Sequence, residues 1–408
     1  METEYKAPPL SLLKRAEENH ENIVAVIEEK KALLEETMRE LGYSINVLSV
    51  NLGNAVTRYE FETPPGIPVK RFYAHNMDLS YHMASRGPIR WEIPLLGRRA
   101  IAVEIPDSDF CPVRIGDVLA NRRQENEAGK LQYIVGKNVF GDIVYGDLQN
   151  TLISGCSGAG KSMFLRSLVV DMLYKKSLSD IQFAMIDLKR EAFVAFKDLP
   201  NLYGAHVSTE EEQALGMLSR LYSEVLRRKM LFDVCNVRDI EHYNCCQHIG
   251  TDGVNKLPYI VCMIDEIAEL TLSDYRKEAL NLIYKTASKS ESCGIYFLLA
   301  TQAAQDRAVM GNVANCMRSF VQFAEPSPQV KAGDIYDRRY WEDAEYDDED
   351  FDSPLCYIES GASALVGNGD MLYNASRGAE SMRVQGVCVT DEEIGAVINH
   401  MCNTYRGV

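Results

Sequence analysis

The sequence predicts an α/β fold in which a mostly parallel sheet, covered by helices on both faces, follows a small α+β domain. Three observations support this prediction. From residue 151 onward, short apolar runs alternate with longer amphipathic segments, which is the pattern of parallel strands joined by helices. Between residues 44 and 105, apolar and polar residues alternate with the period of two typical of strands that are half buried. A glycine-rich segment at residues 155–162 joins a predicted strand to a predicted helix.

Length and composition indicate a folded protein of ordinary hydrophobic content. The chain has 408 residues, of which 46% are hydrophobic and 25% charged, and this length suggests two or three domains. The longest apolar stretches, residues 259–264 and 295–300, are far shorter than the roughly 18 residues that a spanning helix needs. The first ten residues also lack the features of a signal peptide, so we expect a cytoplasmic protein without a membrane span of its own.

Charge and cysteine usage argue against two further classes. The net charge of −16 argues against a uniformly basic nucleic-acid-binding surface, but it allows a locally basic channel. The 11 cysteines form no C-x-x-C pair, so the sequence suggests neither a zinc site nor a disulfide framework. We expect reduced thiols that serve as small apolar residues.

The chain is expected to begin with an amphipathic helical segment, residues 1–44. Aliphatic residues and methionine recur at helical spacing over residues 11–42, and Gly42 would end the helix. Such a helix could bind a partner, although covering the sheet of its own domain is the favoured interpretation.

Two domains and a connector are expected to follow. Residues 45–119 would form the small α+β domain, and residues 120–148 a connector with a short hairpin. Residues 149–400 would form the domain with the parallel sheet, which carries an acidic insertion at residues 326–351. The strands expected in this sheet are residues 151–154, 181–187, 259–265, 295–301 and 320–323, and the expected helices are residues 161–175, 209–233 and 274–290.

The glycine-rich segment matches the P-loop pattern G-x-x-x-x-G-K-[ST], in the strand-to-helix context that makes this motif credible. Its backbone N–H groups would surround the phosphates of ATP, next to the favourable dipole of the helix N-terminus. Lys161 would contact the β- and γ-phosphates, and the Ser162 hydroxyl would bind Mg²⁺. The expected nucleotide-binding residues are Gly155, Cys156, Ser157, Gly158, Ala159, Gly160, Lys161, Ser162 and Met163.

A second motif is an apolar strand, residues 260–264, that ends in two acids. Strands often end in acids, but this one lies about a hundred residues after the P-loop in the same alternation of strands and helices, as a Walker B strand does. Asp265 would hold the magnesium, and Glu266 would polarise the attacking water as general base.

Two further strand ends carry polar residues. Gln302 follows the apolar run 295–300 and could sense the γ-phosphate, although a polar strand cap is the alternative. Residues 187–190, Asp-Leu-Lys-Arg, end another strand at the edge where such sheets bind ligands. They could serve the nucleotide or DNA, or form only a salt-bridged turn.

These motifs, in this order, resemble the FtsK/SpoIIIE family over residues 45–395. In the first domain, GNAVTRYE (53–60), IRWEIP (89–94) and VEIP (103–106) are similar to the family's conserved strands. In the second domain the similar segments are MIDLK (185–189), RRKMLFDVCNVRDIEHYN (227–244), LPYIV (257–261), LVGNGDML (365–372) and VQG (384–386).

The resemblance implies an α domain followed by a RecA-like β domain. It also implies a homohexameric ring with ATP at the subunit interfaces and double-stranded DNA in the channel. A membrane or conjugation protein is a possible partner. No N-terminal membrane part and no C-terminal winged-helix domain are recognisable, so we expect no sequence-guided loading or direction.

The chain departs from the family at several arginine positions. Glu291, Ala303, Pro354 and Asn368 stand where the family commonly has arginine. Such arginines commonly act on a neighbour's ATP or contact DNA. Arg318 is the best remaining candidate for a catalytic arginine that acts in trans, and Arg307 is the second.

An acidic run, residues 341–352, has eight acids in twelve residues. DNA phosphates would repel it, so we expect it outside the channel, on the outer rim or at a subunit boundary, or as a solvated loop without a partner.

Three functions fit these residues. The first is an ATP-driven translocase of double-stranded DNA, from a chromosome, plasmid, conjugative element or virus. The second is an ATPase of a secretion or conjugation complex that recruits protein substrates. The third is a nucleotide-binding scaffold with slow turnover. Stimulation of ATPase activity by duplex DNA would separate the first from the second, and a slow basal rate despite bound ATP would favour the third.

Overall fold

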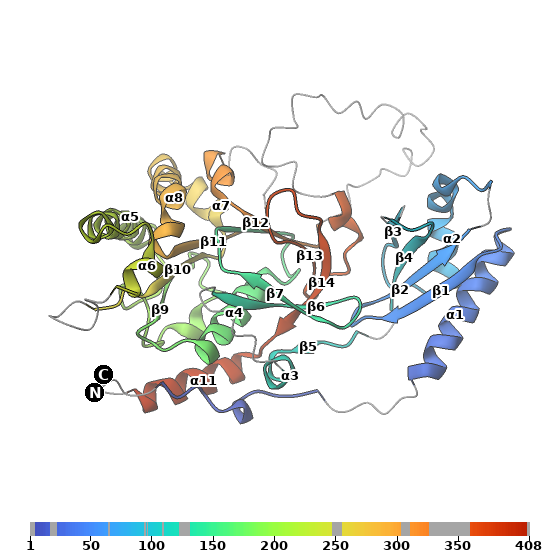
Figure 1. Cartoon of the computed structure of the whole chain (residues 1–408), viewed down its shortest axis with the longest axis horizontal. Helices are drawn as coiled ribbons and strands as arrows, with labels where there is room; N and C mark the ends of the chain where they lie inside the picture. Colours follow the sequence, from blue (N-terminus) through green and yellow to red (C-terminus); the bar gives the residue numbers. More distant parts are fainter. Residues whose placement is uncertain are drawn as a thin grey trace.

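Two sheets organise the computed structural model of the chain (Figure 1). The structure describes residues 5–16, 23–63, 66–93, 95, 97–107, 110–121, 131–246, 255–302, 311–325 and 360–405. Within these ranges, no helix is both long and apolar enough to cross a bilayer. The acidic run, Ala303, Arg307 and Pro354 lie outside the described residues.

The smaller sheet has four antiparallel strands in the order β1-β2-β4-β3. Helix α1, Ile23–Glu40, covers one face and buries Leu34 and Met38 against strand residues such as Phe61. The helix therefore covers the sheet of its own domain, which was the favoured interpretation. The other elements are β1 (Asn46–Leu52), β2 (Val56–Glu62), η2 (Val69–His75), α2 (Asn76–His82), β3 (Arg90–Glu92) and β4 (Ile101–Pro106).

The expectation that this helix begins at residue 11 was wrong. Residues 10–12 form a short 3₁₀ helix, η1 (Leu10–Leu12), and the chain then runs along the larger domain. The backbone N–H of Lys14 donates to Glu393 Oε1 at 2.6 Å, and that of Ala16 donates to Asp117 Oδ2 at 2.9 Å. Because these donors bond side chains of the larger domain, they are not available to continue a helix.

The larger sheet has ten strands, nine of them in the order β7-β6-β14-β13-β12-β8-β11-β10-β9, with β5 paired to β14. Strands β12, β8, β11, β10 and β9 are parallel, which confirms the predicted α/β class. The bounds are β5 (Val113–Arg114), β6 (Gln132–Asn138), β7 (Ile143–Asp147), β8 (Thr151–Ser154), β9 (Ile181–Ile186), β10 (Tyr259–Ile264), β11 (Ile295–Thr301), β12 (Ser319–Phe323), β13 (Asp370–Asn374) and β14 (Met382–Cys388).

The hairpin expected within the connector, residues 120–148, is present, but its place in the larger sheet was not expected. Residues 132–147 form β6 and β7, which extend the larger sheet beyond β14. A Cβ on Gly136 would lie 2.1 Å from the Gln385 carbonyl oxygen, so the glycine allows these two strands to approach. Tyr133 and Val135 are fully buried and extend the core under the hairpin.

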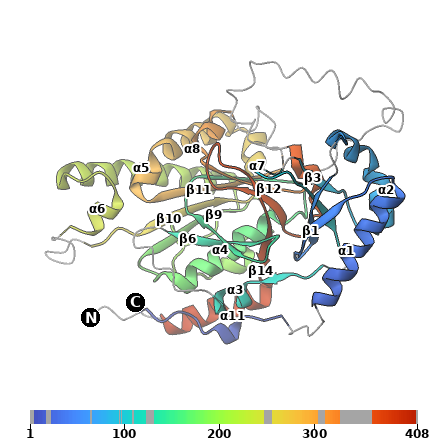
Figure 2. The same cartoon turned by 45° about the vertical axis from the view of Figure 1, so that its right-hand side comes forward.

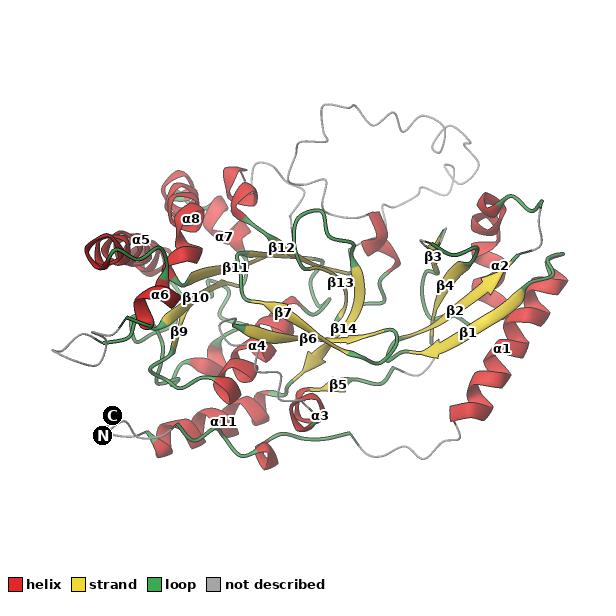
Figure 3. Cartoon of the chain, viewed as in Figure 1, coloured by secondary structure: helices red, strands yellow, loops and turns green. Residues whose placement is uncertain are grey.

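Helices cover both faces of the larger sheet (Figures 2 and 3). Alternate residues of β10 explain the two cores: Val261 and Met263 pack on one side, and Ile260, Cys262 and Ile264 on the other. Helix α4 (Lys161–Lys175) and α11 (Asp391–Thr404) cover the first face; α5 (Glu211–Cys235) and α8 (Arg276–Ser290) cover the second. The shorter helices are α3 (Ile115–Ala120), η3 (Val194–Phe196), α6 (Ile240–Asn244), α7 (Ile267–Leu272), η4 (Glu291–Cys293), η5 (Gly311–Cys316) and η9 (Ser360–Ala364).

Candidate active site

The P-loop leads from β8 into α4, and its backbone requires glycine at particular positions. Gly155, Gly158 and Gly160 have φ values of 142°, 75° and 128°, which side chains disfavour. A Cβ on Gly155 would lie 2.6 Å from Phe323 Cβ, and one on Gly160 would lie 2.9 Å from the Gly369 backbone. The loop therefore packs tightly between β12 and the turn before β13, and ends at the N-terminus of α4.

Lys161 lies over this loop. Its ammonium donates to the carbonyl oxygens of Gly155 at 2.7 Å and of Cys156 at 2.9 Å. Burial lowers the pKa of Lys161, and the nearby carboxylates of Glu266 and Asp265 offset only part of that shift. A partly desolvated cation above a loop of backbone N–H groups is suited to bind phosphate.

Ser162 and Asp265 meet next to Lys161. The Ser162 hydroxyl donates to Asp265 Oδ1 at 2.7 Å, although 103 residues separate the two in sequence. Burial raises the pKa of Asp265, and the hydrogen bond from Ser162 opposes the shift. The structure thus brings together the two oxygen-bearing residues predicted to hold magnesium, and oxygen is the ligand that Mg²⁺ prefers.

Glu266 is buried between Gln302, which follows β11, and Lys189, which follows β9. Its Oε1 accepts the backbone N–H of Gln302 at 3.2 Å, so this residue contacts Glu266 through its main chain. Lys189 Nζ lies 3.7 Å from Glu266 Oε2 and 3.3 Å from Glu269 Oε1. Burial lowers the pKa of Lys189, but attraction to these two carboxylates outweighs it and the pKa is raised.

Residues 187–190 contribute in different ways. Asp187 accepts the backbone N–H groups of Glu191, Ala192 and Phe193 at 3.2, 2.9 and 2.8 Å, so it shapes the turn. Arg190 pairs with Glu210 at the surface. Of these four described residues, Lys189 is the one that forms an ion pair with a predicted catalytic residue, Glu266, and this partner was not predictable from the sequence.

A cavity of about 250 Å³ adjoins the P-loop. It was not predicted, although the segments around residues 369 and 386 stood out in the sequence. Its lining is mostly apolar side chains and backbone: Phe110, Pro112, Val113, Gly158, Gly160, Met163, Phe164, Phe323, Asn368, Gly369, Gln385, Gly386, Val387 and Cys388.

Of the remaining predicted residues, three lie at the P-loop or its cavity and Arg318 lies away from them. Met163 lines the cavity, and the Ala159 carbonyl accepts the Gly369 N–H at 2.9 Å. Ser157 is exposed on the loop. Arg318 is not part of this site in its own chain: it precedes Ser319, which pairs with Thr151 at the start of β8, whereas the P-loop follows the end of β8.

Comparison with known proteins agrees with this architecture. A model of the FtsK/SpoIIIE family matches residues 114–306, and a model of the FtsK alpha domain matches residues 7–107. The chain is 31% identical over 407 residues to the DNA translocase FtsK of Caldanaerobacter subterraneus subsp. tengcongensis, covering 99% of this chain and 53% of that protein. The DNA translocase FtsK of Clostridium tetani is 31% identical over 404 residues, with coverages of 97% and 50%. The chain thus spans about half the length of these relatives.

Solved structures share the fold. The conjugation coupling protein TcpA of pCW3, as a monomer with ATPγS, superposes with a TM-score of 0.54 at 17% identity, covering 91% of this chain and 99% of that one. The type VII secretion ATPase EccC of Thermomonospora curvata gives a TM-score of 0.52 at 15% identity, with coverages of 71% and 34%. At such identities the likeness concerns the fold alone. The two matched domains, in the order of the sequence motifs and with the P-loop geometry described above, show that the chain belongs to the FtsK/SpoIIIE family.

Proposed function

We propose that this chain hydrolyses Mg-ATP and uses the energy to move double-stranded DNA as a subunit of a hexameric ring. The observation that carries the proposal is the convergence of Lys161, the Ser162–Asp265 pair and Glu266 beyond the C-terminal ends of β8 and β10, the two parallel strands on either side of β11. An acid that could accept a proton stands beside a phosphate-binding loop, which is the arrangement of an ATPase.

Each residue has a distinct role in this proposal. Lys161 neutralises phosphate charge, and Ser162 and Asp265 hold Mg²⁺, which would offset negative charge on the phosphates. Glu266 accepts the proton of the attacking water at a carboxylate oxygen. The Gln302 N–H and Lys189 both contact Glu266 and would keep its carboxylate oriented.

The cavity beside the P-loop is our candidate site for the base and ribose of the nucleotide. Gly158, Gly160 and Met163 belong to both the loop and the cavity wall, so a nucleotide with its phosphates on the loop can place its remainder there. The apolar and backbone lining suits a flat aromatic base.

Double-stranded DNA and the ring are supported by the family rather than by the nucleotide site. The relatives that match nearly all of this chain are named DNA translocases, and both FtsK-type domains are present. The decisive test is ATPase activity measured with and without long duplex DNA. Strong stimulation supports the proposal, whereas stimulation only by a protein substrate would assign the chain to the recruiting class.

One observation favours a slow nucleotide-binding scaffold as the second candidate. Arg318, the proposed trans-acting cation, is paired with Glu291. If turnover stays slow with saturating ATP and DNA, the scaffold is the better description.

A further inference from the structure

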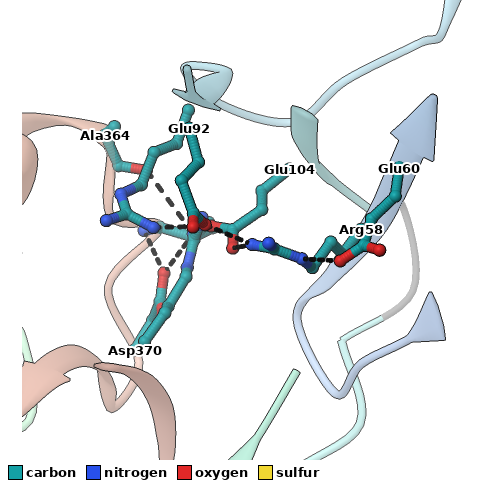
Figure 4. Close-up of polar contacts among 9 residues, drawn as sticks. Arg58, Glu60, Glu92, Glu104, Ala364 and Asp370 are labelled. Atoms are coloured by element: carbon teal, nitrogen blue, oxygen red, sulfur yellow. Dashed lines mark hydrogen bonds and ion pairs between the residues drawn. The ribbon is translucent and has the colours of Figure 1, made fainter. Parts of the chain in front are cut away.

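A cluster of buried charges joins the two sheets (Figure 4). We call it the inter-sheet charge cluster. From the small sheet it takes Arg58, Glu60, Arg90, Glu92 and Glu104, and from the larger sheet Asp370 and Arg383. Six of these residues lie in segments that resemble the family, and Arg383 directly precedes the segment 384–386, but no role was predicted for any of them.

Glu104 on β4 and Arg383 on β14 make the link between the sheets. Arg383 Nη1 donates to Glu104 Oε2 at 2.8 Å, and both side chains are 2% exposed. The same carboxylate accepts Arg58 Nη1 at 2.9 Å and Arg90 Nη1 at 3.3 Å. Burial would raise the pKa of Glu104, but the three guanidinium groups outweigh it and lower the pKa.

On its other side, Arg383 binds Asp370 at the start of β13, directly after the turn that contacts the P-loop. Its Nε and Nη2 donate to the two carboxylate oxygens of Asp370 at 3.0 and 2.6 Å. Asp370 Oδ2 also accepts the Val366 N–H at 2.8 Å, and this fixes the turn over residues 366–370. Because the planar Arg383 guanidinium binds Asp370 on one side and Glu104 on the other, it ties the positions of these two residues together.

The turn itself touches the nucleotide site. The Gly369 N–H donates to the carbonyl of Ala159 in the P-loop at 2.9 Å, and Asn368 and Gly369 line the cavity. A path therefore runs from Ala159 to Gly369 by a hydrogen bond, along the main chain to Asp370, and through hydrogen bonds of Arg383 to Glu104. A shift of the P-loop would reach the small sheet through contacts that are buried and costly to break.

A second contact between the sheets lies on the same side. The Arg58 guanidinium carbon is 5.6 Å from the centroid of the Phe140 ring, at the turn between β6 and β7. Arg58 thus meets both Glu104 and the larger sheet's hairpin, so the small sheet is held at two points.

We propose that the Arg383–Glu104 ion pair couples nucleotide binding at the P-loop to the small four-stranded sheet. Arg383 is a positioning residue in this scheme: it sets the turn over residues 366–370 against the loop. The inference rests on the proposed nucleotide site and adds to it a route by which the small domain responds to the nucleotide.

Hydrogen–deuterium exchange of the full chain tests the proposal, with ATPγS as the probe. In the wild type, the nucleotide should slow exchange in peptides of residues 155–163 and also in peptides of β2 and β4, by about fivefold or more. In Glu104→Gln, the nucleotide should still protect residues 155–163, but the response of β2 and β4 should disappear. By reciprocity, the affinity for ATPγS should fall about fivefold or more in the variant.

A matched control separates coupling from loss of stability. Glu224→Gln weakens another, partly buried, ion pair on α5, with Arg228, whose Nε lies 2.7 Å from Glu224 Oε1. It should leave the nucleotide response of β2 and β4 intact. Arg383→Lys, which keeps the charge but loses the double grip on Asp370, provides a second variant if Glu104→Gln does not fold.

The outcomes are distinct. Protection of residues 155–163 without any response in wild-type β2 and β4 overturns the coupling and leaves the nucleotide site standing. The coupling is likewise overturned if β2 and β4 respond fully to ATPγS in Glu104→Gln or Arg383→Lys. Absence of protection at residues 155–163 in the wild type overturns the proposed nucleotide site itself, and the coupling with it.

Discussion

Arg318 and Glu291 form an ion pair at the N-terminal end of β12, where Arg318 Nε lies 2.9 Å from Glu291 Oε2. Glu291 is the acid that the resemblance implied in place of a family arginine, and its Oε1 also accepts the Asn150 N–H at 2.8 Å. The pair therefore joins an expected departure from the family to the best candidate for a trans-acting cation. Because the Arg318 side chain is 68% exposed, solvent weakens the pair and leaves the guanidinium accessible to a neighbour.

Lys161→Ala should abolish nucleotide binding or turnover. The substitution removes the ammonium that lies over the P-loop carbonyls, while the glycines that shape the loop remain. Binding of a fluorescent ATP analogue and steady-state ATPase rates would measure the effect. Unchanged affinity and rate would contradict the assignment of this lysine to the phosphates.

Glu266→Gln should separate binding from hydrolysis. The amide keeps nearly the same shape, and its oxygen can still accept the Gln302 N–H, but it cannot take a proton from water. We expect ATP affinity close to that of the wild type and a turnover lower by about 10²–10⁴-fold. Glu269→Gln, which alters the other carboxylate beside Lys189, is the matched control and should hydrolyse ATP. A parental rate in Glu266→Gln would show that another group is the base.

The P-loop and the acid pair at residues 265–266 could be predicted because their signal is local. Glycines at fixed spacing and an apolar strand ending in acids are readable within a few residues, and the order of strands and helices placed both at one edge of the sheet. Even the contact between Ser162 and Asp265 follows from that order.

Features made by distant pairing were not predictable in this way. β6 and β7 join the larger sheet because β6 pairs with β14. Gly136 of β6 pairs with Gly386 of β14, which lies 250 positions later in the sequence. The Arg383–Glu104 bond spans 279 residues. Periodicity shows that a segment is a strand but not which strand it meets, so the hairpin was expected as part of a connector, its pairing with β14 was missed, and so was the charge cluster.

Acid should weaken the link between the sheets. The pKa of Glu104 is lowered from its ordinary value of 4.5, mainly through Arg383 and Arg90 acting against burial. A carboxylate with a lowered folded-state pKa adds stability above its unfolded pKa, and that stability is lost as pH falls through the folded value. Arg58, Arg90 and Arg383 face Glu104 as cations. The other acids in the cluster are Glu60, Glu92 and Asp370, each paired with Arg58 or Arg383.

Denaturant melts of the wild type and Glu104→Gln at several pH values would check this. At pH 7 the variant should be less stable by about 3–5 kcal/mol, the usual effect of breaking a buried pair from one side. The difference should shrink as pH drops well below 4.5, where the wild type also loses the charge. A difference that is independent of pH would show that packing, rather than charge, explains the loss.

DNA binding should tolerate sequence and depend strongly on salt. In a channel, contacts to phosphates dominate, and each one releases counterions, so the logarithm of affinity falls with the logarithm of salt by about 0.9 per phosphate. Fluorescence anisotropy with unrelated duplexes of equal length, at a series of NaCl concentrations, measures both properties, and single strands serve as the control. Tight binding that persists unchanged when salt rises severalfold would contradict the channel.

The ion pair between Arg318 and Glu291 allows a trans-acting role of Arg318 to be distinguished from a structural one. If Arg318 stabilises charge on a neighbour's γ-phosphate, Arg318→Ala should lower DNA-stimulated turnover by about a thousandfold. Glu291→Gln removes the same ion pair but keeps the guanidinium, so it should retain the activity. A purely structural pair would instead give both variants the same modest loss.

Mixing subunits then identifies the interface. Arg318→Ala and Glu266→Gln subunits would each be inactive alone under this proposal. Mixed rings should recover part of the ATPase rate, because some interfaces combine an intact arginine from one subunit with an intact base from the next. The recovered rate should depend on the mixing ratio and vanish when Lys161→Ala is added to the Arg318→Ala subunits, since those subunits supply the intact base. Full activity of Arg318→Ala alone would exclude Arg318 as the trans-acting residue.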